Sequence, residues 1–374
     1  MTTATSEKAA AGPRARRLPR ELHPAAWWGW AIGLAAAASF TTNPFVLLLL
    51  VAAAAWVVAQ RRGDHPWARS FRLYLWFGLF IVVVRVVFRV LLGGGYGTVV
   101  WLDLPTVPLP DWVAGVVLLG PITQETVLAG LYDGMRLATI VIAIGAANAL
   151  ANPKRLLKSL PPALYEVGTA VVVAVTVIPQ LADSVRRVRR AQELRGGPPG
   201  RIRGLRRLVV PVLEDALARS LQLAAGMDAR GYGRAGTATP AERRTTGALM
   251  LAGLIGLCLG IYALLDQAGE GDLGVPLLVL GCLLAGTGIA AAGRRVRRTR
   301  YRPDRWAPAE IGVLACGVAT ATLVILSADR AMLANYPPLT AVPQVTVLLL
   351  MAVLLAAAPA LVAPAPSYPE RSRS

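Results

Sequence analysis

The sequence predicts an all-α polytopic membrane protein with about eight transmembrane helices and a cytoplasmic helical module in the middle of the chain. Hydrophobic residues make up 55% of the 374 residues, and the mean hydropathy is +0.53. The apolar residues fall in long blocks almost free of charge, and Lys and Arg crowd into the stretches between these blocks. A bilayer imposes this segregation, because a helix that spans it needs about 20 predominantly apolar residues in succession.

The net charge of +18 would suggest nucleic-acid binding in a soluble protein. Here the basic runs contain few aromatic residues on which bases could stack, and cytoplasmic loops of membrane proteins concentrate Lys and Arg. We therefore expect no nucleic acid among the partners. The three cysteines lie in apolar segments, and the two histidines lack metal-ligand spacing, so we expect no disulfide, metal site or cofactor.

The N-terminal half is predicted to contain four membrane helices. An arginine-rich polar tail precedes them without a cleavage signal, so the tail is expected in the cytoplasm. The segment 93–120 lacks Lys and Arg and is expected outside. The helices are expected at residues 27–40, 44–58, 71–92 and 122–150.

The middle of the chain, residues 151–245, is predicted to be a cytoplasmic or interfacial module of paired helices. Its apolar run 167–178 ends at Pro179 and is followed by a cluster of arginines. A run this short is typically re-entrant or interfacial, so we keep it on the cytoplasmic face. The Gly- and Pro-rich segment 196–200 divides the polar part of the module in two.

Four further apolar segments complete the membrane part, with the turn at 269–271 expected outside. These segments are expected at 246–265, 275–292, 311–326 and 342–362. The predicted domains are a cytoplasmic tail at 1–26, membrane helices at 27–150, the central module at 151–245, membrane helices at 246–363 and a second cytoplasmic tail at 364–374.

One short pattern occurs twice in the central module, each time at the expected end of a helix. The chain reads Glu-Leu-Arg-Gly up to Arg195 and Gly196, and Asp-Ala-Arg-Gly over Ala229, Arg230 and Gly231. Glycine directly after a helix adopts the left-handed conformation at low cost. Arginine near a helix C-terminus can simply complement the helix dipole. Because the pattern is repeated, we favour docking arginines, since a guanidinium pairs bidentately with a partner carboxylate.

These two signatures resemble the coupling helices of the transmembrane T component (EcfT/CbiQ-like) of energy-coupling factor (ECF) ABC transporters. The resemblance covers roughly residues 20–235. It extends to the dipeptides His23-Pro24, Asn43-Pro44 and Asn152-Pro153. The first signature departs from the family, because it has leucine where alanine is common, and the apolar pair at 246–292 has no counterpart to which we can assign a role.

The resemblance implies an energy-coupling scaffold without catalytic activity in the plasma (inner) membrane. Its partners would be two ABC-type ATPase subunits in the cytoplasm and a membrane S component that binds a vitamin or metal ion. Arg195 and Arg230 would dock the ATPases. The sequence itself contains no Gly-x-x-x-x-Gly-Lys-Ser/Thr phosphate loop, so ATP would be hydrolysed by a partner.

Ionisable residues also occur inside the predicted third and fourth membrane helices. Such residues are costly in a bilayer and are usually paired or functional. Similar depth and opposite charge favour ion pairs of Arg89 with Glu125 and of Arg85 with Asp133.

Two other function classes stay open on the sequence alone. A membrane-bound enzyme acting on lipid-linked phosphorylated substrates would use basic loops to grip phosphates, but no convergent acid-base or metal set is visible. A secondary transporter would show matching broken helices in its two halves, and these are not found.

Overall fold

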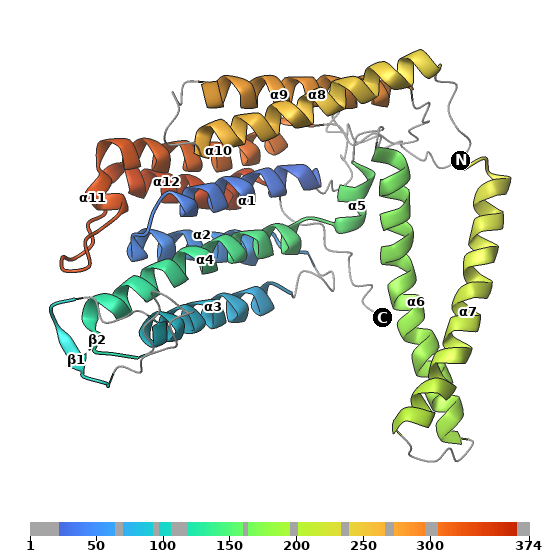
Figure 1. Cartoon of the computed structure of the whole chain (residues 1–374), viewed down its shortest axis with the longest axis horizontal. Helices are drawn as coiled ribbons and strands as arrows, with labels where there is room; N and C mark the ends of the chain where they lie inside the picture. Colours follow the sequence, from blue (N-terminus) through green and yellow to red (C-terminus); the bar gives the residue numbers. More distant parts are fainter. Residues whose placement is uncertain are drawn as a thin grey trace, which may run out of the picture. The chain divides into compact units, whose positions relative to one another are not determined.

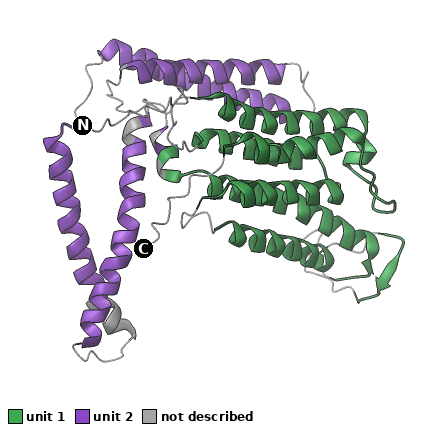
Figure 2. Cartoon of the chain, turned by 180° about the vertical axis from the view of Figure 1, so that it is seen from behind, with its two compact units in different colours: residues 1–156, 304–374 green, residues 157–303 purple. Residues whose placement is uncertain are grey.

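The computed structural model describes most of the chain and divides it into two compact units. The described residues are 22–63, 70–92, 97–105, 119–159, 164–194, 201–232, 239–265, 273–295 and 306–364. One unit comprises residues 1–156 and 304–374, and the other comprises residues 157–303 (Figure 2). The predicted domains were defined by whether each segment lies in the membrane or in the cytoplasm. The division into compact units does not test that assignment.

The first unit is a bundle of helices with a minimal sheet (Figure 1). Two short strands, β1 (Val100–Leu102) and β2 (Ile122–Thr123), pair antiparallel. The helices of this unit are α1 (Pro24–Ser39), α2 (Pro44–Arg61), α3 (Phe71–Leu92), α4 (Gln124–Leu150), α5 (Pro153–Lys158), α10 (Pro308–Arg330), α11 (Met332–Asn335), α12 (Val347–Ala357) and α13 (Pro359–Val362).

Proline starts three of these helices at the dipeptides that carry the family resemblance. His23 caps α1 and accepts a hydrogen bond from the amide of Ala25 at 3.2 Å. Asn43 caps α2 in the same way, and α5 begins at Pro153. The fixed φ of proline suits the first helical turn, where its missing N–H would have no partner.

Helix α1 lies in the core of the first unit, where it packs against α10 and α4. The contact with α10 is close because Gly33 and Gly317 remove side chains from both surfaces. Trp30 is fully buried, and its indole nitrogen donates a hydrogen bond to the carbonyl oxygen of Ala356 at 3.1 Å. This bond satisfies a polar group that burial would otherwise penalise.

A buried side-chain amide at the start of α2 connects this helix to α11 and to the segment between α11 and α12. The side-chain nitrogen of Asn43 donates to the carbonyl oxygens of Ala334 and Gln344, both at 2.8 Å. Its oxygen accepts from the amides of Phe45 and Val46. All the main hydrogen-bonding groups of this side chain are therefore used, and the Asn-Pro turn anchors a distant part of the chain.

Helix α3 packs on α4 and exposes most of its large apolar side chains. Leu73, Trp76 and Phe80 are among the exposed residues. An apolar surface of this extent is typical of a helix that faces lipid.

The second unit consists of two helix pairs. Helices α6 (Tyr165–Leu194) and α7 (Arg201–Ala229) cross each other, and α8 (Pro240–Leu265) packs along α9 (Gly274–Arg295). Glycines allow α8 and α9 to pack closely. A Cβ built on Gly253 would lie 2.5 Å from the backbone nitrogen of Ala285. Small residues of this kind let membrane helices approach each other closely.

Seven helices are long and apolar enough to cross a membrane, as judged by length and composition within the described residues. They are α2, α3, α4, α8, α9, α10 and residues Val167–Leu194 of α6. This confirms the predicted all-α polytopic membrane fold. Helix α1 has 16 residues, and α12 with α13 forms the shorter apolar stretch Val347–Val362.

Several predicted boundaries differ from the structure, among them the starts of the helices expected from residues 27 and 246, which begin at Pro24 and Pro240. The apolar run 167–178 was expected as a separate short segment that ends at Pro179, but the helix that contains it continues to Leu194 with this proline inside it. Proline removes one backbone hydrogen bond from a helix interior, and the amphipathic sequence that follows resumes the helix. The last membrane segment was expected from residue 342, but its helix begins only at Val347, and Pro343 lies in the irregular segment before it.

Candidate functional site: the crossed helices α6 and α7

The C-terminus of α7 forms a closed turn around the second repeated signature. The amide of Gly231 donates to the carbonyl oxygen of Asp228 at 2.9 Å, and the amide of Tyr232 donates to that of Met227 at 3.0 Å. Gly231 has a φ of 76°, which glycine adopts without the strain a Cβ would bring. These two bonds define a Schellman motif and confirm that this glycine ends the helix.

The Schellman turn leaves Arg230 at the tip of α7. Its side chain is exposed, and none of the ion pairs formed within the described residues includes it. A guanidinium at a helix end, with no carboxylate partner among the residues that the structure describes, suits a contact with another protein. Ala229, the last residue of α7, is exposed as well.

The first signature follows α6. Leu194, its last described residue, is 90% exposed, whereas Arg195 and Gly196 lie outside the described residues. Helix α7, which follows the first signature in the sequence, contains 29 residues and is about 43 Å long.

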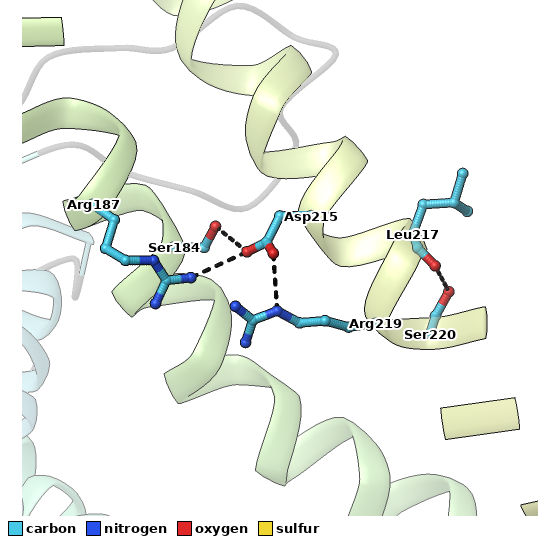
Figure 3. Close-up of polar contacts among 6 residues, drawn as sticks. All are labelled: Ser184, Arg187, Asp215, Leu217, Arg219 and Ser220. Atoms are coloured by element: carbon cyan, nitrogen blue, oxygen red, sulfur yellow. Dashed lines mark hydrogen bonds and ion pairs between the residues drawn. The ribbon is translucent and has the colours of Figure 1, made fainter. Parts of the chain in front are cut away.

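One carboxylate connects α6 and α7 where they cross (Figure 3). Asp215 of α7 accepts a hydrogen bond from the Ser184 hydroxyl at 2.6 Å and pairs with Arg187 at 3.2 Å, both through Oδ2. Its Oδ1 pairs with Arg219 at 3.0 Å. Ser184 is 2% exposed, so the donor from α6 is buried at the helix contact.

Spacing on each helix explains this cluster. Ser184 and Arg187 are three residues apart on α6, and Asp215 and Arg219 are four apart on α7. Residues at these spacings lie on one face of a helix. The Ser184 hydroxyl and, after it, Arg219 hold the pKa of Asp215 below its usual range, so the carboxylate is charged at neutral pH.

Sequence analysis did not single out Asp215 or Ser184. The Asp215–Arg219 spacing is visible in the sequence, but such a pair on a helix surface is common and weak. What makes the carboxylate unusual is Ser184, which approaches it from another helix. The structure places Arg219 in this cluster with its side chain 43% exposed.

The comparison with known proteins identifies the family. Residues 15–240 match the CbiQ family, described as "Cobalt transport protein". The chain belongs to the CbiQ family. It is also 28% identical, over 192 residues that cover 44% of this chain and 71% of the relative, to the "Energy-coupling factor transporter transmembrane protein EcfT" of Leuconostoc gelidum subsp. gasicomitatum.

Membership of the CbiQ family confirms the resemblance inferred from the repeated signatures. The protein is a multi-pass membrane component of an EcfT/CbiQ-type energy-coupling transporter and is not an enzyme. Helices α6 and α7 lie within the matched residues 15–240, whereas α8 begins at their last residue. The hairpin of α8 and α9, like the helices that follow it, lies outside the matched residues apart from Pro240.

The expected intramembrane ion pairs are not among the ion pairs of the described residues of this CbiQ-family chain. Within the described residues, no ion pair joins Arg85 to Asp133 or Arg89 to Glu125. Helix α3 approaches α4 closely here, since a Cβ built on Gly130 would lie 3.1 Å from the Cβ of Arg89. Neither pairing is confirmed, and both stay predictions.

Glu125 has another partner at the start of α4. Its Oε1 accepts hydrogen bonds from the amide and the hydroxyl of Thr98, at 2.9 and 2.8 Å. Its Oε2 is buried without a hydrogen bond, and a Cβ on Gly97, which has a φ of 144°, would lie 2.3 Å from this oxygen. Glu125 therefore fixes the segment that leads into β1, and Gly97 makes room for it.

Proposed function

We propose that this chain is the energy-coupling transmembrane scaffold of an ECF-type ABC importer in the plasma (inner) membrane. It links ATP hydrolysis by two partner ATPases to the uptake of a vitamin or metal ion, which a separate S component binds. The central module, with Arg230 and Gly231 at the end of α7 and with Arg195 and Gly196 following α6 in the sequence, is the cytoplasmic docking element.

The geometry at the end of α7 carries this proposal. A Schellman turn holds Arg230 in a fixed, exposed position, and its guanidinium has no carboxylate partner among the described residues. An arginine with this geometry matches an acidic groove, because its planar fork forms two parallel hydrogen bonds with one carboxylate. The first signature has the same two residues, Arg195 and Gly196, after Leu194 in the sequence.

The repetition of the signature supports two ATPase subunits. The sequence contains two arginine signatures, Arg195-Gly196 and Arg230-Gly231. Two copies of an ATPase would each accept one of these arginines. The absence of a phosphate loop from the sequence agrees with ATP hydrolysis by such partners.

The importer function is tested by purification of the tagged chain from its native membranes. The eluate should contain an ABC-type ATPase at about two copies per chain and a small membrane protein that retains the vitamin or metal ion. Reconstituted into liposomes, this complex should accumulate that substrate only when ATP is supplied on the side of the ATPases. A chain that purifies without an ATPase, or uptake that does not require ATP, would contradict the proposal.

A further inference from the structure

The cluster around Asp215 connects helices α6 and α7 where they cross. Figure 1 shows α6 and α7 crossing near the end where α6 stops and α7 begins, and diverging towards the N-terminus of α6 and the C-terminus of α7. The crossing is made at the point where Ser184 and Arg187 of α6 meet Asp215 of α7 (Figure 3). One side chain thus receives donors from both helices.

We propose that Asp215 is a positioning residue that fixes the angle between α6 and α7, so that a force applied at Arg230 is passed to α6. This inference rests on the proposed function for its link to ATPases, but the role of Asp215 at the crossing stands on geometry alone. Without a fixed crossing, movement at the end of α7 would rotate that helix about its neighbour and would not reach the rest of the module.

The chemistry of the cluster explains why a carboxylate is needed. Asp215 uses both oxygens to accept three donors, from Ser184, Arg187 and Arg219. An asparagine at this position has one acceptor oxygen, and its NH₂ group would face a donor. It would also leave two guanidinium groups close together without the negative charge between them.

The ion pairs around Asp215 are partly exposed, so each pair alone contributes little. The side chain of Arg187 is 56% exposed, that of Arg219 is 43% exposed and that of Asp215 is 35% exposed. Surface pairs of this kind contribute weakly to stability. The hydrogen bond from Ser184, which is 2% exposed, is shielded from water and gives the crossing its specificity.

Glu214 provides the matched control. It is the carboxylate next to Asp215 in the sequence, and it is exposed and takes part in none of the described ion pairs. Glu214→Gln and Asp215→Asn remove the same charge from adjacent positions on α7. Only the second change should affect the crossing.

The first experiment measures the crossing in the full-length chain, reconstituted in nanodiscs without partners. Spin labels are attached to Val171→Cys on α6 and Leu223→Cys on α7, two exposed positions on the diverging arms, after the native cysteines have been replaced by alanine. Pulsed electron paramagnetic resonance should give one narrow distance distribution in the parent chain and after Glu214→Gln. Asp215→Asn should broaden it, with the original distance losing roughly three- to tenfold in population. An unchanged distribution would overturn the proposal.

The second experiment separates coupling from docking in the complex with the ATPases. Because both docking arginines are intact, Asp215→Asn should bind the ATPases at the parental level, whereas the amount of substrate transported per ATP hydrolysed should fall. Cross-linking of a Ser184→Cys/Asp215→Cys pair with a short bifunctional thiol reagent should restore the transport ratio. Equal loss of ATPase binding and transport, or no rescue by the cross-link, would refute a positioning role.

The two experiments fail in different ways. If the distance distribution broadens in Asp215→Asn but the parent chain binds no ATPase, the crossing role holds and the importer function is wrong. If the parent complex transports substrate but the distribution does not change, the importer function holds and the role of Asp215 is wrong.

Discussion

Gly33 of α1 and Gly317 of α10 lie in direct backbone contact. A Cβ built on Gly33 would fall 2.3 Å from the carbonyl oxygen of Gly317, and one built on Gly317 would fall 2.5 Å from the Cα of Trp30. The obstacles are backbone atoms, which cannot move aside as a flexible side chain can. This contact therefore sets the distance between the two helices in the core of the first unit.

Gly33→Ala should destabilise the protein by roughly 1 to 3 kcal/mol or more, because it forces α1 and α10 apart. Gly29→Ala is the control on the same helix, since its Cβ would meet only the end of the Leu314 side chain. Thermal unfolding in detergent should show a clearly lower midpoint for Gly33→Ala than for Gly29→Ala. Equal midpoints would mean that the contact does not set the packing.

Substitution of Asn43 should lower the free energy of unfolding, even when the new side chain has the same size. Asn43→Asp retains an oxygen to cap α2 but places a carboxylate against the carbonyl oxygens of Ala334 and Gln344. We expect a loss of roughly 2 to 5 kcal/mol for Asn43→Asp and Asn43→Ala. Thr42→Ala, which keeps the backbone hydrogen bond of Thr42 to Asn335, should stay within about 0.5 kcal/mol of the parent. Similar unfolding midpoints for all three variants would disprove the anchoring role of the buried amide.

Several of these features follow from local sequence, and others do not. The helix start at Pro44 and the helix end at Gly231 depend on backbone rules that act over one turn, so the sequence predicted them, whereas the first helix begins at Pro24 and was expected from residue 27. The continuation of α6 through Pro179 was missed, because the cost of a proline is a local signal that the surrounding helix overrides. The Asp215 cluster was missed for another reason: Ser184 and Asp215 meet only through a tertiary crossing, which no periodicity reveals.

The predicted ion pair of Arg89 with Glu125 can be tested against the hydrogen bonds that Glu125 accepts from Thr98 in the structure. If the predicted pair forms in the membrane, Glu125→Gln should lower the amount of protein in the membrane, and Arg89→Gln should partly restore it, because an unpaired buried charge is costly. If Glu125 serves only to bind Thr98, Thr98→Val should reproduce part of the defect and Arg89→Gln should restore nothing. Quantitative immunoblotting of membranes distinguishes the two outcomes. The same design applies to Arg85 and Asp133.

The helix crossing should tolerate acidification. Its donors hold the pKa of Asp215 below the usual range, with the Ser184 hydrogen bond as the largest cause. A carboxylate with a lowered pKa in the folded state stabilises that state fully above its ordinary pKa, and the stabilisation is lost as the pH falls through the lowered value. The distance distribution between labels on α6 and α7 should therefore be the same at pH 7 and at about pH 5, above the ordinary pKa of aspartate. Broadening already at pH 5 to 6 would show that Asp215 does not hold the crossing.

The docking arginines give the most direct test of the central claim. Arg230 projects from a helix end and not from a packed core, so Arg195→Ala and Arg230→Ala should leave the unfolding midpoint of the protein unchanged. Each should weaken ATPase association, since loss of one partner of a desolvated interfacial charge pair costs about 2 to 5 kcal/mol. Arg230→Lys should rescue poorly, because lysine retains the charge but not the planar fork.

The control for this test is Arg190→Ala. Arg190 is an exposed arginine of α6 that forms none of the described ion pairs, whereas Arg219 is unsuitable because it contacts Asp215. The deciding measurement is the amount of ATPase that co-purifies with Arg195→Ala, Arg230→Ala, the double variant and Arg190→Ala. The account predicts partial loss in each single variant, complete loss in the double variant and parental binding in the control. Parental ATPase binding by the double variant would contradict it.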